Sequence, residues 1–466
     1  MRRPPLLLAL PLLFAACNVG PDYHRPKIEV SNTWVEPAHA GPVDAKWWGS
    51  FDDPVLTKLV EQALANNPSL AEASARLAEA RALREAAQGG RLPQGGASAS
   101  ANENRVSENG QFPVANIPGF DPDFSLFDAG FDASWEIDLW GGTSRAIQSA
   151  VAREQAAMWA RRDAEVSLVA EVARAYIDFR AAQASLDIAQ DRANASAEIA
   201  RLTQLLYAAG EADQQSADLA ASAAQGAGAA LDKAQADVAG AEYRIGVLAG
   251  TIPEKIRPEL DASSAPVPAP PEVIAGGIRS ELLKRRPDVR RAERELAAAT
   301  ANIGVATAQL YPSLSLVGGV GLQAKATDKL TDSGSLRYSV GPTFRWPIFS
   351  LGRLRAQVRA ADARAQAAAA SYEKAVLGAL ADSESAANRY AASTRAAGAA
   401  GSALAREQNA YKLAELREQR GEDSKLALAQ ARLQLTQAKE RDLLARAARS
   451  DSAVALYKSL GGGWSN

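Results

Sequence analysis

Short stretches in which apolar and polar residues alternate predict amphipathic β-strands in both halves of the chain. From Ala129 to Leu139 the odd positions are apolar, and the even positions carry glycine, serine or an acid. A period of two places these two classes of side chain on opposite faces of a strand. Pro93 to Arg105 shows a weaker version, with serine and asparagine opposite alanine. We therefore expect a strand hairpin over about residues 93–140.

A second hairpin is expected over about residues 312–349. Leucine and valine alternate with serine and glycine after Pro312, and aromatic or aliphatic residues alternate with polar ones from Leu336 to Ile348. Pro342 falls on the apolar side, which argues against a buried central strand in a soluble sheet. Charged residues on the polar faces of the predicted strands are Asp132, Glu136, Asp138, Arg337 and Arg345.

Two long runs without proline, Gly141–Gly210 and Gly352–Gly421, predict long helices over 141–210 and 352–420. A helix of about 70 residues would be about 105 Å long, at about 1.5 Å per residue. Patterns of this length are typical of coiled coils and repeats. Shorter helices are expected over 213–249 and 424–460. The second of these has steps of alternating 3 and 4 residues between its seam positions, which are Leu426, Ala429, Leu433, Thr436, Glu440, Leu443, Ala447, Ser450, Val454 and Tyr457.

The two halves of the chain are an internal duplication. Asn67-Pro68 corresponds to Arg286-Pro287 at an offset of 219, and Gly142-x-x-Arg145 corresponds to Gly352-x-x-Arg355 at an offset of 210. Each half reads helix, strand, strand, long helix, turn, second helix. The first repeat covers residues 53–250 and the second covers 273–460. A proline-rich linker, 251–272, separates them, and residues 461–466 form a tail.

The N-terminus has the features of an export signal: Arg2-Arg3, an apolar run, and small residues before Cys17. Phe14-Ala15-Ala16-Cys17 resembles the lipobox of bacterial lipoproteins. This resemblance implies removal of residues 1–16 and a lipid on Cys17, and Asn18 then permits sorting to the outer membrane. An ordinary secretory signal with a chance cysteine is the alternative. Residues 17–52 are expected to form a lipid-anchored strap along another surface.

Composition excludes several classes of function. The formal net charge is −2, so no basic surface indicates nucleic-acid binding. There are two histidines and one cysteine, which argues against an internal disulfide, a His/Cys metal site or a histidine-based catalytic triad. No enzyme activity, no metal and no cofactor other than the covalent lipid are expected.

Strands of about 10 residues with one apolar and one polar face are typical of membrane barrels with a watery interior. One chain supplies four such strands, whereas closed membrane barrels need at least about eight, and open sheet edges are not tolerated in lipid. The barrel would therefore need several copies of the chain. A soluble sandwich with the same alternation is the alternative.

The chain resembles the lipoprotein branch of the TolC family, the outer-membrane factors of tripartite efflux systems. Cys17-Asn18-Val19-Gly20-Pro21-Asp22-Tyr23, the paired hairpin and long-helix units, and the ending Ala455-Leu456-Tyr457-Lys458-Ser459-Leu460-Gly461-Gly462-Gly463-Trp464 carry the resemblance. It implies a homotrimer with a 12-stranded β-barrel and a twelve-helix periplasmic α-barrel, in contact with outer-membrane lipid. It also implies a periplasmic adaptor protein and an inner-membrane RND-type pump as partners, and passive passage of small molecules such as drugs.

The resemblance places the periplasmic tip and gate at two turns, Tyr207 to Asp218 and Leu416 to Asp423. The family often has an aspartate six residues after the turn glycine, whereas this chain has Ser216 and Ala427 there. The expected gate residues are Tyr207, Gly210, Asp213, Arg420, Gly421 and Asp423. A solvated helix-cap role is the alternative for Asp213 and Asp423.

Two other functions remain open from the residues. A trimeric lipoprotein could act as a structural periplasmic spacer, but a spacer needs only helices and not amphipathic strands. A type I protein-secretion conduit is closer, although family members that serve it usually lack a lipid anchor.

Overall fold

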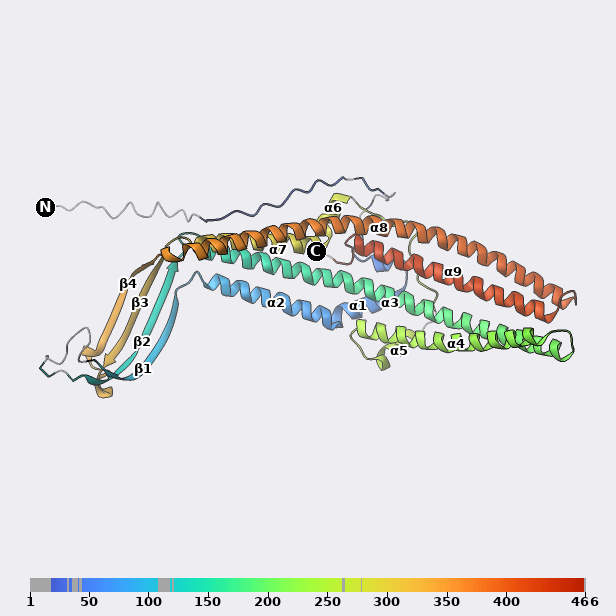
Figure 1. The fold of residues 1–466 in the computed structure, drawn as a ribbon, viewed down its shortest axis with the longest axis horizontal. Helices are drawn as coiled ribbons and strands as arrows, with labels where there is room; N and C mark the ends of the chain where they lie inside the picture. The colour runs from blue at the N-terminus through green and yellow to red at the C-terminus, as the bar shows by residue number, and fades with distance from the viewer. Residues whose placement is uncertain are drawn as a thin grey trace. The chain divides into compact units, whose positions relative to one another are not determined.

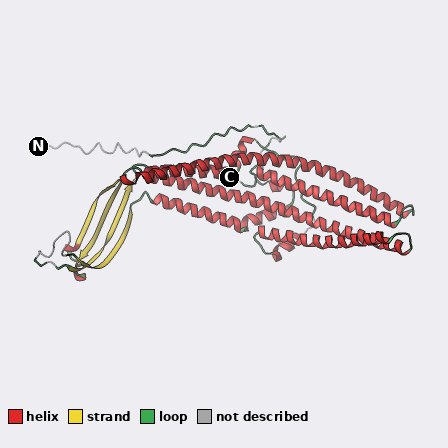
Figure 2. Ribbon diagram, viewed as in Figure 1, coloured by secondary structure: helices red, strands yellow, loops and turns green. Residues whose placement is uncertain are grey.

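A computed structural model describes residues 18–31, 33–35, 41, 44–107, 118–119, 121–261, 265–277 and 279–464. The predicted signal peptide and Cys17 lie outside these residues. Helices and the four strands make up the described elements (Figure 2). The first repeat contains α1 (Pro54–Asn66), α2 (Pro68–Gly89), β1 (Gln94–Arg105), β2 (Asp123–Ile137), α3 (Gly142–Ala208) and α4 (Gln214–Leu248). The second contains α6 (Arg279–Arg285), α7 (Pro287–Ala308), β3 (Ser313–Ala324), β4 (Leu336–Arg345), α8 (Leu351–Gln419) and α9 (Lys425–Ser459).

The chain divides into two units. Unit 1 comprises Met1–Pro26, Leu77–Ala156 and Ala292–Tyr372, and unit 2 comprises Lys27–Arg76, Ala157–Arg291 and Glu373–Asn466. Four of the five divisions fall within α2, α3, α7 and α8, and the fifth falls between Pro26 and Lys27. In the described part of the chain, no helix has both the length and the apolar character needed to span a membrane.

Unit 1 contains one four-stranded antiparallel sheet with the order β1-β2-β3-β4 (Figure 1). The two repeats meet at β2 and β3, where Phe127 pairs with Ala324 and Ile137 with Leu314. β1 and β3 correspond at an offset of 219 at both ends (313 − 94 and 324 − 105). The two predicted hairpins are therefore confirmed, and each repeat supplies one.

The core of unit 2 forms around α1 and the segment before it. Leu56, Leu59, Val60 and Ala63 are buried at the spacing of one helix face. Asp53 caps the helix, since its Oδ1 accepts hydrogen bonds from the backbone N–H groups of Val55 and Leu56. A short 3₁₀-helix, Trp47–Phe51, lies at the end of the strap.

The two longest helices, α3 and α8, end in the same way in both repeats. α3 closes at Gly210 (φ 79°) and α8 closes at Gly421 (φ 73°). The residue after each glycine donates from its N–H to a carbonyl five residues earlier, from Glu211 to Leu206 and from Glu422 to Arg417. This bond pattern uses the left-handed conformation that glycine adopts without a steric penalty.

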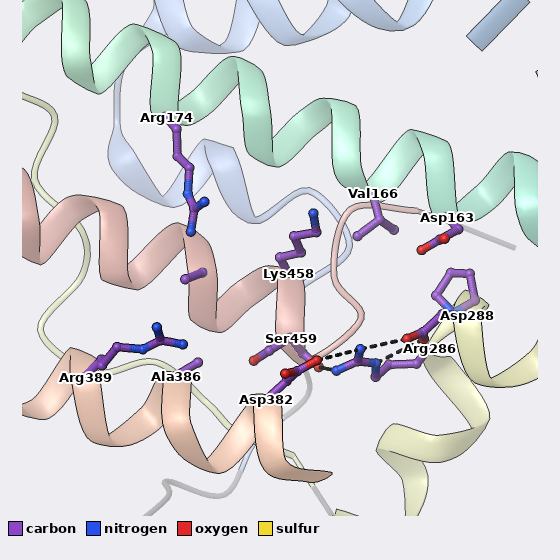
Figure 3. Close-up of a pocket in the computed structure, with 12 residues that line it drawn as sticks. Asp163, Val166, Arg174, Arg286, Asp288, Asp382, Ala386, Arg389, Lys458 and Ser459 are labelled. Carbon is purple, nitrogen blue, oxygen red and sulfur yellow. Dashed lines mark hydrogen bonds and ion pairs between the residues drawn. The ribbon is translucent and has the colours of Figure 1, made fainter. Parts of the chain in front are cut away.

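The C-terminal ends of α4 and α9 are held by corresponding residues of the two repeats. Asn67 donates from Nδ2 to the carbonyl of Leu248 (2.9 Å), and Arg286 donates from Nη1 to the carbonyl of Ser459 (3.2 Å). Arg286 also pairs with Asp288 and Asp382, as Figure 3 shows. The duplication therefore extends to the polar contacts that hold the helix ends, with a neutral side chain in one repeat and a charged one in the other.

One element was missed in the proline-rich linker. Residues Pro253–Asp261 form α5, within the segment 251–272 that the sequence analysis described only as a proline-rich linker. Pro253 stands at the first helical position, where its missing N–H is not needed. Ile256 and Leu260 are both buried and lie four residues apart, so one apolar face holds this short helix in place despite Pro258.

The predicted seam of α9 is confirmed in the described structure. Seven of its positions are buried: Ala429, Thr436, Leu443, Ala447, Ser450, Val454 and Tyr457. The other three seam residues, Leu426, Leu433 and Glu440, are half-buried.

Candidate functional site

Four of the five predicted polar-face residues lie in strands and share one face of the sheet. Directly paired residues of antiparallel strands lie on the same face. Asp132 pairs with Gly319 and Glu136 with Ser315, on the face to which Arg337 and Arg345 also belong. Whether this face lines a channel stays a prediction.

The fifth residue, Asp138, was wrongly assigned to a strand. β2 ends at Ile137, and the Asp138 carboxylate accepts hydrogen bonds from the backbone N–H groups of Thr143 (3.0 Å) and Ser144 (2.8 Å). Asp138 therefore satisfies free donors at the start of α3, where the positive end of the helix dipole also favours an acid. Period-two alternation does not distinguish this position from a strand position.

Asp128 is a polar-face residue that the alternation did not identify. Its carboxylate accepts two hydrogen bonds from Arg337 (2.6 and 2.8 Å) and one from Gln323 (2.9 Å). The pair crosses β3 at Gly321, which has no side chain to obstruct it. Phe124 and Leu126 precede Asp128 on the same face, so the polar pattern begins only there.

The opposite face of the sheet exposes large apolar side chains. Phe131, Val320 and Tyr338 form a row across three strands and are 67%, 49% and 78% exposed. Trp135, Leu316 and Pro342 form a second row. A continuous apolar surface of this kind on one side and charged residues on the other is the pattern of a membrane β-strand.

At the first predicted tip, Asp213 caps α4, and its gate role stays a prediction. Its Oδ1 accepts a hydrogen bond from the backbone N–H of Ser216 (2.6 Å) at the start of α4. This backbone hydrogen bond lowers the pKa of the exposed Asp213 carboxyl. Tyr207 is also exposed, on the last turn of α3.

At the second tip, the cap is Ser424 and not Asp423. The Ser424 hydroxyl accepts from the backbone N–H of Ala427, whereas Asp423 lies 4.0 Å from Arg417 in an ion pair. Arg420 is exposed beside Gly421. Of the two predicted gate acids, Asp423 is therefore the one whose carboxylate does not cap a helix.

The first described residues of the strap are held at the start of α3. The N–H of Val19 donates to the carbonyl of Trp140 (3.1 Å). The buried Arg145 guanidinium donates to the carbonyls of Val19 (3.1 Å) and Gly20 (3.2 Å) and pairs with Asp22 (2.8 Å). These contacts place residues 19–22 along the start of α3 and fix Val19, two residues after Cys17, beside the end of β2.

A charged cluster between α3 and α9 was not predicted. Asp191 pairs with Lys439 (3.1 Å) and Arg432 (3.2 Å), and Arg192 pairs with Glu440 (3.0 Å). Burial opposes ionisation of Asp191, but the hydrogen bonds from Lys439 and Arg432 outweigh it and lower the pKa. The cluster joins the long helix of the first repeat to the second helix of the other repeat.

Comparisons with known proteins agree on one family. The sequence profile of the outer membrane efflux protein family matches residues 59–251 and 278–462, one segment in each repeat. The pyoverdine export outer membrane protein OpmQ of Pseudomonas aeruginosa is 32% identical over 470 aligned positions, which cover 98% of this chain and 96% of OpmQ. The solvent efflux pump outer membrane protein SrpC of Pseudomonas putida is 30% identical, with 97% of each chain covered.

Among solved structures, the outer-membrane channel OprN matches with a TM-score of 0.84 at 35% identity, covering 96% of this chain and all of OprN (100%). The match confirms the predicted fold class of long helices with a four-stranded membrane sheet. The chain belongs to the outer membrane efflux protein family and is an outer-membrane channel component of an efflux system.

Proposed function

We propose that three copies of this chain form one passive channel that carries small molecules out of the periplasm. The observation that carries the proposal is the sheet of unit 1, which has an apolar face, a charged face and two outer strands, β1 and β4. Unpaired strand edges are not tolerated in lipid. Three sheets of four strands (3 × 4 = 12) would pair every edge and enclose the charged faces in a barrel.

The long helices then form a tube of twelve helices that leads from the barrel to the two tips of each chain. A periplasmic adaptor and an inner-membrane RND-type pump would deliver the substrate at these tips. The names of OpmQ and SrpC refer to pyoverdine export and solvent efflux, which supports small organic molecules as the cargo. The energy for transport would come from the pump, because the channel itself only provides a path.

Recordings from planar bilayers test both the channel and its gate. The purified wild-type protein is expected to show a low-conductance state. The double variant Asp213→Asn/Asp423→Asn should change the conductance and weaken cation preference, because like charges from three copies at a narrow tip raise the local field. Asparagine caps helices about as well as aspartate, so the start of α4 is preserved.

Asp232→Asn, at an exposed position of α4 beyond the tip, is the matched control and should behave as the wild type. If the double variant has unchanged conductance and ion selectivity, the two aspartates are not part of the gate. A purified protein that never conducts would contradict the channel proposal itself.

A lipid on Cys17 would anchor each chain at the membrane surface. The support comes from the lipobox and from the contacts that hold Val19 at the junction of β2 and α3. Cells fed a labelled fatty acid should incorporate the label into the wild-type protein and not into Cys17→Ser. Asn18→Gln, which keeps the cysteine, serves as the control, and equal labelling of Cys17→Ser would refute the anchor.

A further inference from the structure

The helices of unit 1 follow the order of the strands to which they are joined: α2, α3, α7 and α8. The two outer helices, α2 and α8, each leave one face open. Each helix is joined to one strand, and neighbouring helices are tied by side chains: Arg84 of α2 pairs with Glu154 of α3 (2.9 Å), and Arg294 of α7 donates to Gln155 of α3 (3.2 Å). α2 and α8 are attached to the outer strands β1 and β4. Glu85 is exposed on α2, where it also pairs with Arg84 of the same helix (3.6 Å), and the exposed basic residues at the start of α8 are Arg353, Arg355 and Arg359.

The duplication indicates what meets these faces. Among the helices of unit 1, the first repeat contacts the second through α3 and α7. α3 corresponds to α8 at an offset of 210 (Arg145 and Arg355), and α7 corresponds to α2 at an offset of 219, both helices having 22 residues. If the second repeat made the same contact with the next chain, its α8 would therefore join the α2 of another copy. Heterologous contacts of this kind generate closed rings.

One close contact between α3 and α7 identifies the residues that would meet in the second interface. A Cβ added to Gly304 would lie 2.7 Å from Cγ of Arg145 and 2.8 Å from the carbonyl oxygen of Val19. Arg145 thus lies directly over residue 304 and uses its guanidinium to bind the carbonyls of the strap. The counterpart of Arg145 is Arg355 (145 + 210), and the counterpart of Gly304 is Glu85 (304 − 219).

We infer that Arg355 of each copy forms an ion pair with Glu85 of the partner subunit. A Cβ at position 304 would lie 2.7 Å from Cγ of Arg145, so the Arg355 side chain must lie farther from α2 than the Arg145 side chain lies from α7. The Glu85 side chain then takes the space that Val19 of the strap occupies over Gly304, and its carboxylate replaces the strap carbonyls as the acceptor for the arginine. Ala78, Ala82 and Ala86 on α2 leave room for the close approach of a second helix. The inference rests on the trimer of the proposed function, and it adds the residues and the register by which one copy recognises the next.

Disulfide cross-linking tests the register. In the double variant Glu85→Cys/Arg355→Cys, mild oxidation of membranes should produce covalent dimers and trimers on a non-reducing gel, because a disulfide forms only between Cα atoms less than about 7 Å apart. The control is Leu83→Cys/Arg355→Cys. Leu83 is also exposed but points to the other side of α2, two residues and about 200° away. It should give about tenfold less cross-linked product.

Charge exchange provides a second readout. Arg355→Glu should reduce the fraction of trimer that survives detergent, and Glu85→Arg/Arg355→Glu should restore it. A preparation that is trimeric by light scattering but gives no product with the 85/355 cysteine pair would overturn the inference and leave the channel proposal standing. A protein that is monomeric and non-conducting would refute the proposed function, and the ion pair with it.

Discussion

Replacing Trp47 with alanine is expected to lower the free energy of unfolding of unit 2 by about 3–5 kcal/mol, the usual cost of removing a buried tryptophan. Trp47 is 1% exposed and stacks on Tyr457 with ring centroids 5.1 Å apart. It also packs edge-on against Trp48 and Phe51. The change would therefore leave a cavity between the strap and α9. Denaturant unfolding followed by circular dichroism measures the loss.

Trp34→Ala is the matched control for this prediction. Trp34 is half-buried, and its Nε1 donates one hydrogen bond to the carbonyl of Gly277 (3.1 Å). Its loss should cost only about 1 kcal/mol. Equal effects of the two substitutions would show that the aromatic cluster around Trp47 is not a centre of stability.

The second large effect concerns pH and the buried carboxyl of Asp451 on α9. Burial, together with the nearby charge of Asp178, raises the pKa of Asp451 to about 7, while Arg174 opposes the change. Both neighbours lie on α3, and Asp178 pairs with Arg244 of α4 (3.3 Å). The Oδ1 of Asp451 is buried and has no hydrogen-bond partner in the described structure. The neutral acid is therefore the form that suits this position.

The sign of the pH effect follows from linkage. The pKa of Asp451 is higher in the folded protein than in the unfolded chain, so the unfolded chain releases its proton first as pH rises. The stability from the neutral acid is complete below about pH 4 and is lost as pH rises to about 7. A difference of about three pKa units corresponds to at most about 4 kcal/mol, and partial hydration reduces this to about 2 kcal/mol.

Melting temperatures of the wild type and Asp451→Asn between pH 5 and pH 8 check this prediction. The wild type should lose stability over this range, and the variant should be nearly insensitive and more stable at pH 8. Asp232→Asn, which removes an exposed carboxylate of α4, should keep the wild-type slope. Parallel curves for the wild type and Asp451→Asn would contradict the assignment.

Local patterns were sufficient to predict the strands, the long helices and the duplication. Each of these rests on a period or a turn residue that neighbouring positions set, such as Gly210 and Gly421 at the ends of α3 and α8. α5 was missed because its stability comes from burial of Ile256 and Leu260, which outweighs the unfavourable Pro258. Propensity alone does not contain that contribution.

The functional surfaces were predicted less completely for a related reason. Arg337 was recognised as a polar-face residue, but its partner Asp128 is 209 residues away in sequence and is brought near only by the order of the strands. The Asp191 cluster likewise depends on which helices pack together. Asp138 shows the opposite case. The period-two alternation continues past the end of β2, so it placed Asp138 in a strand although the backbone there already leads into α3.

The two outer strands of the sheet also determine how the protein can assemble. The turns, caps and seams of the helices form within one chain and need no partner. Within the part of the chain that the structure describes, the outer edges of β1 and β4 have no such partner, and lipid offers them no hydrogen bonds. Membrane insertion should therefore be a late and concerted step that requires three folded chains at once, so its rate should fall steeply when the protein is dilute.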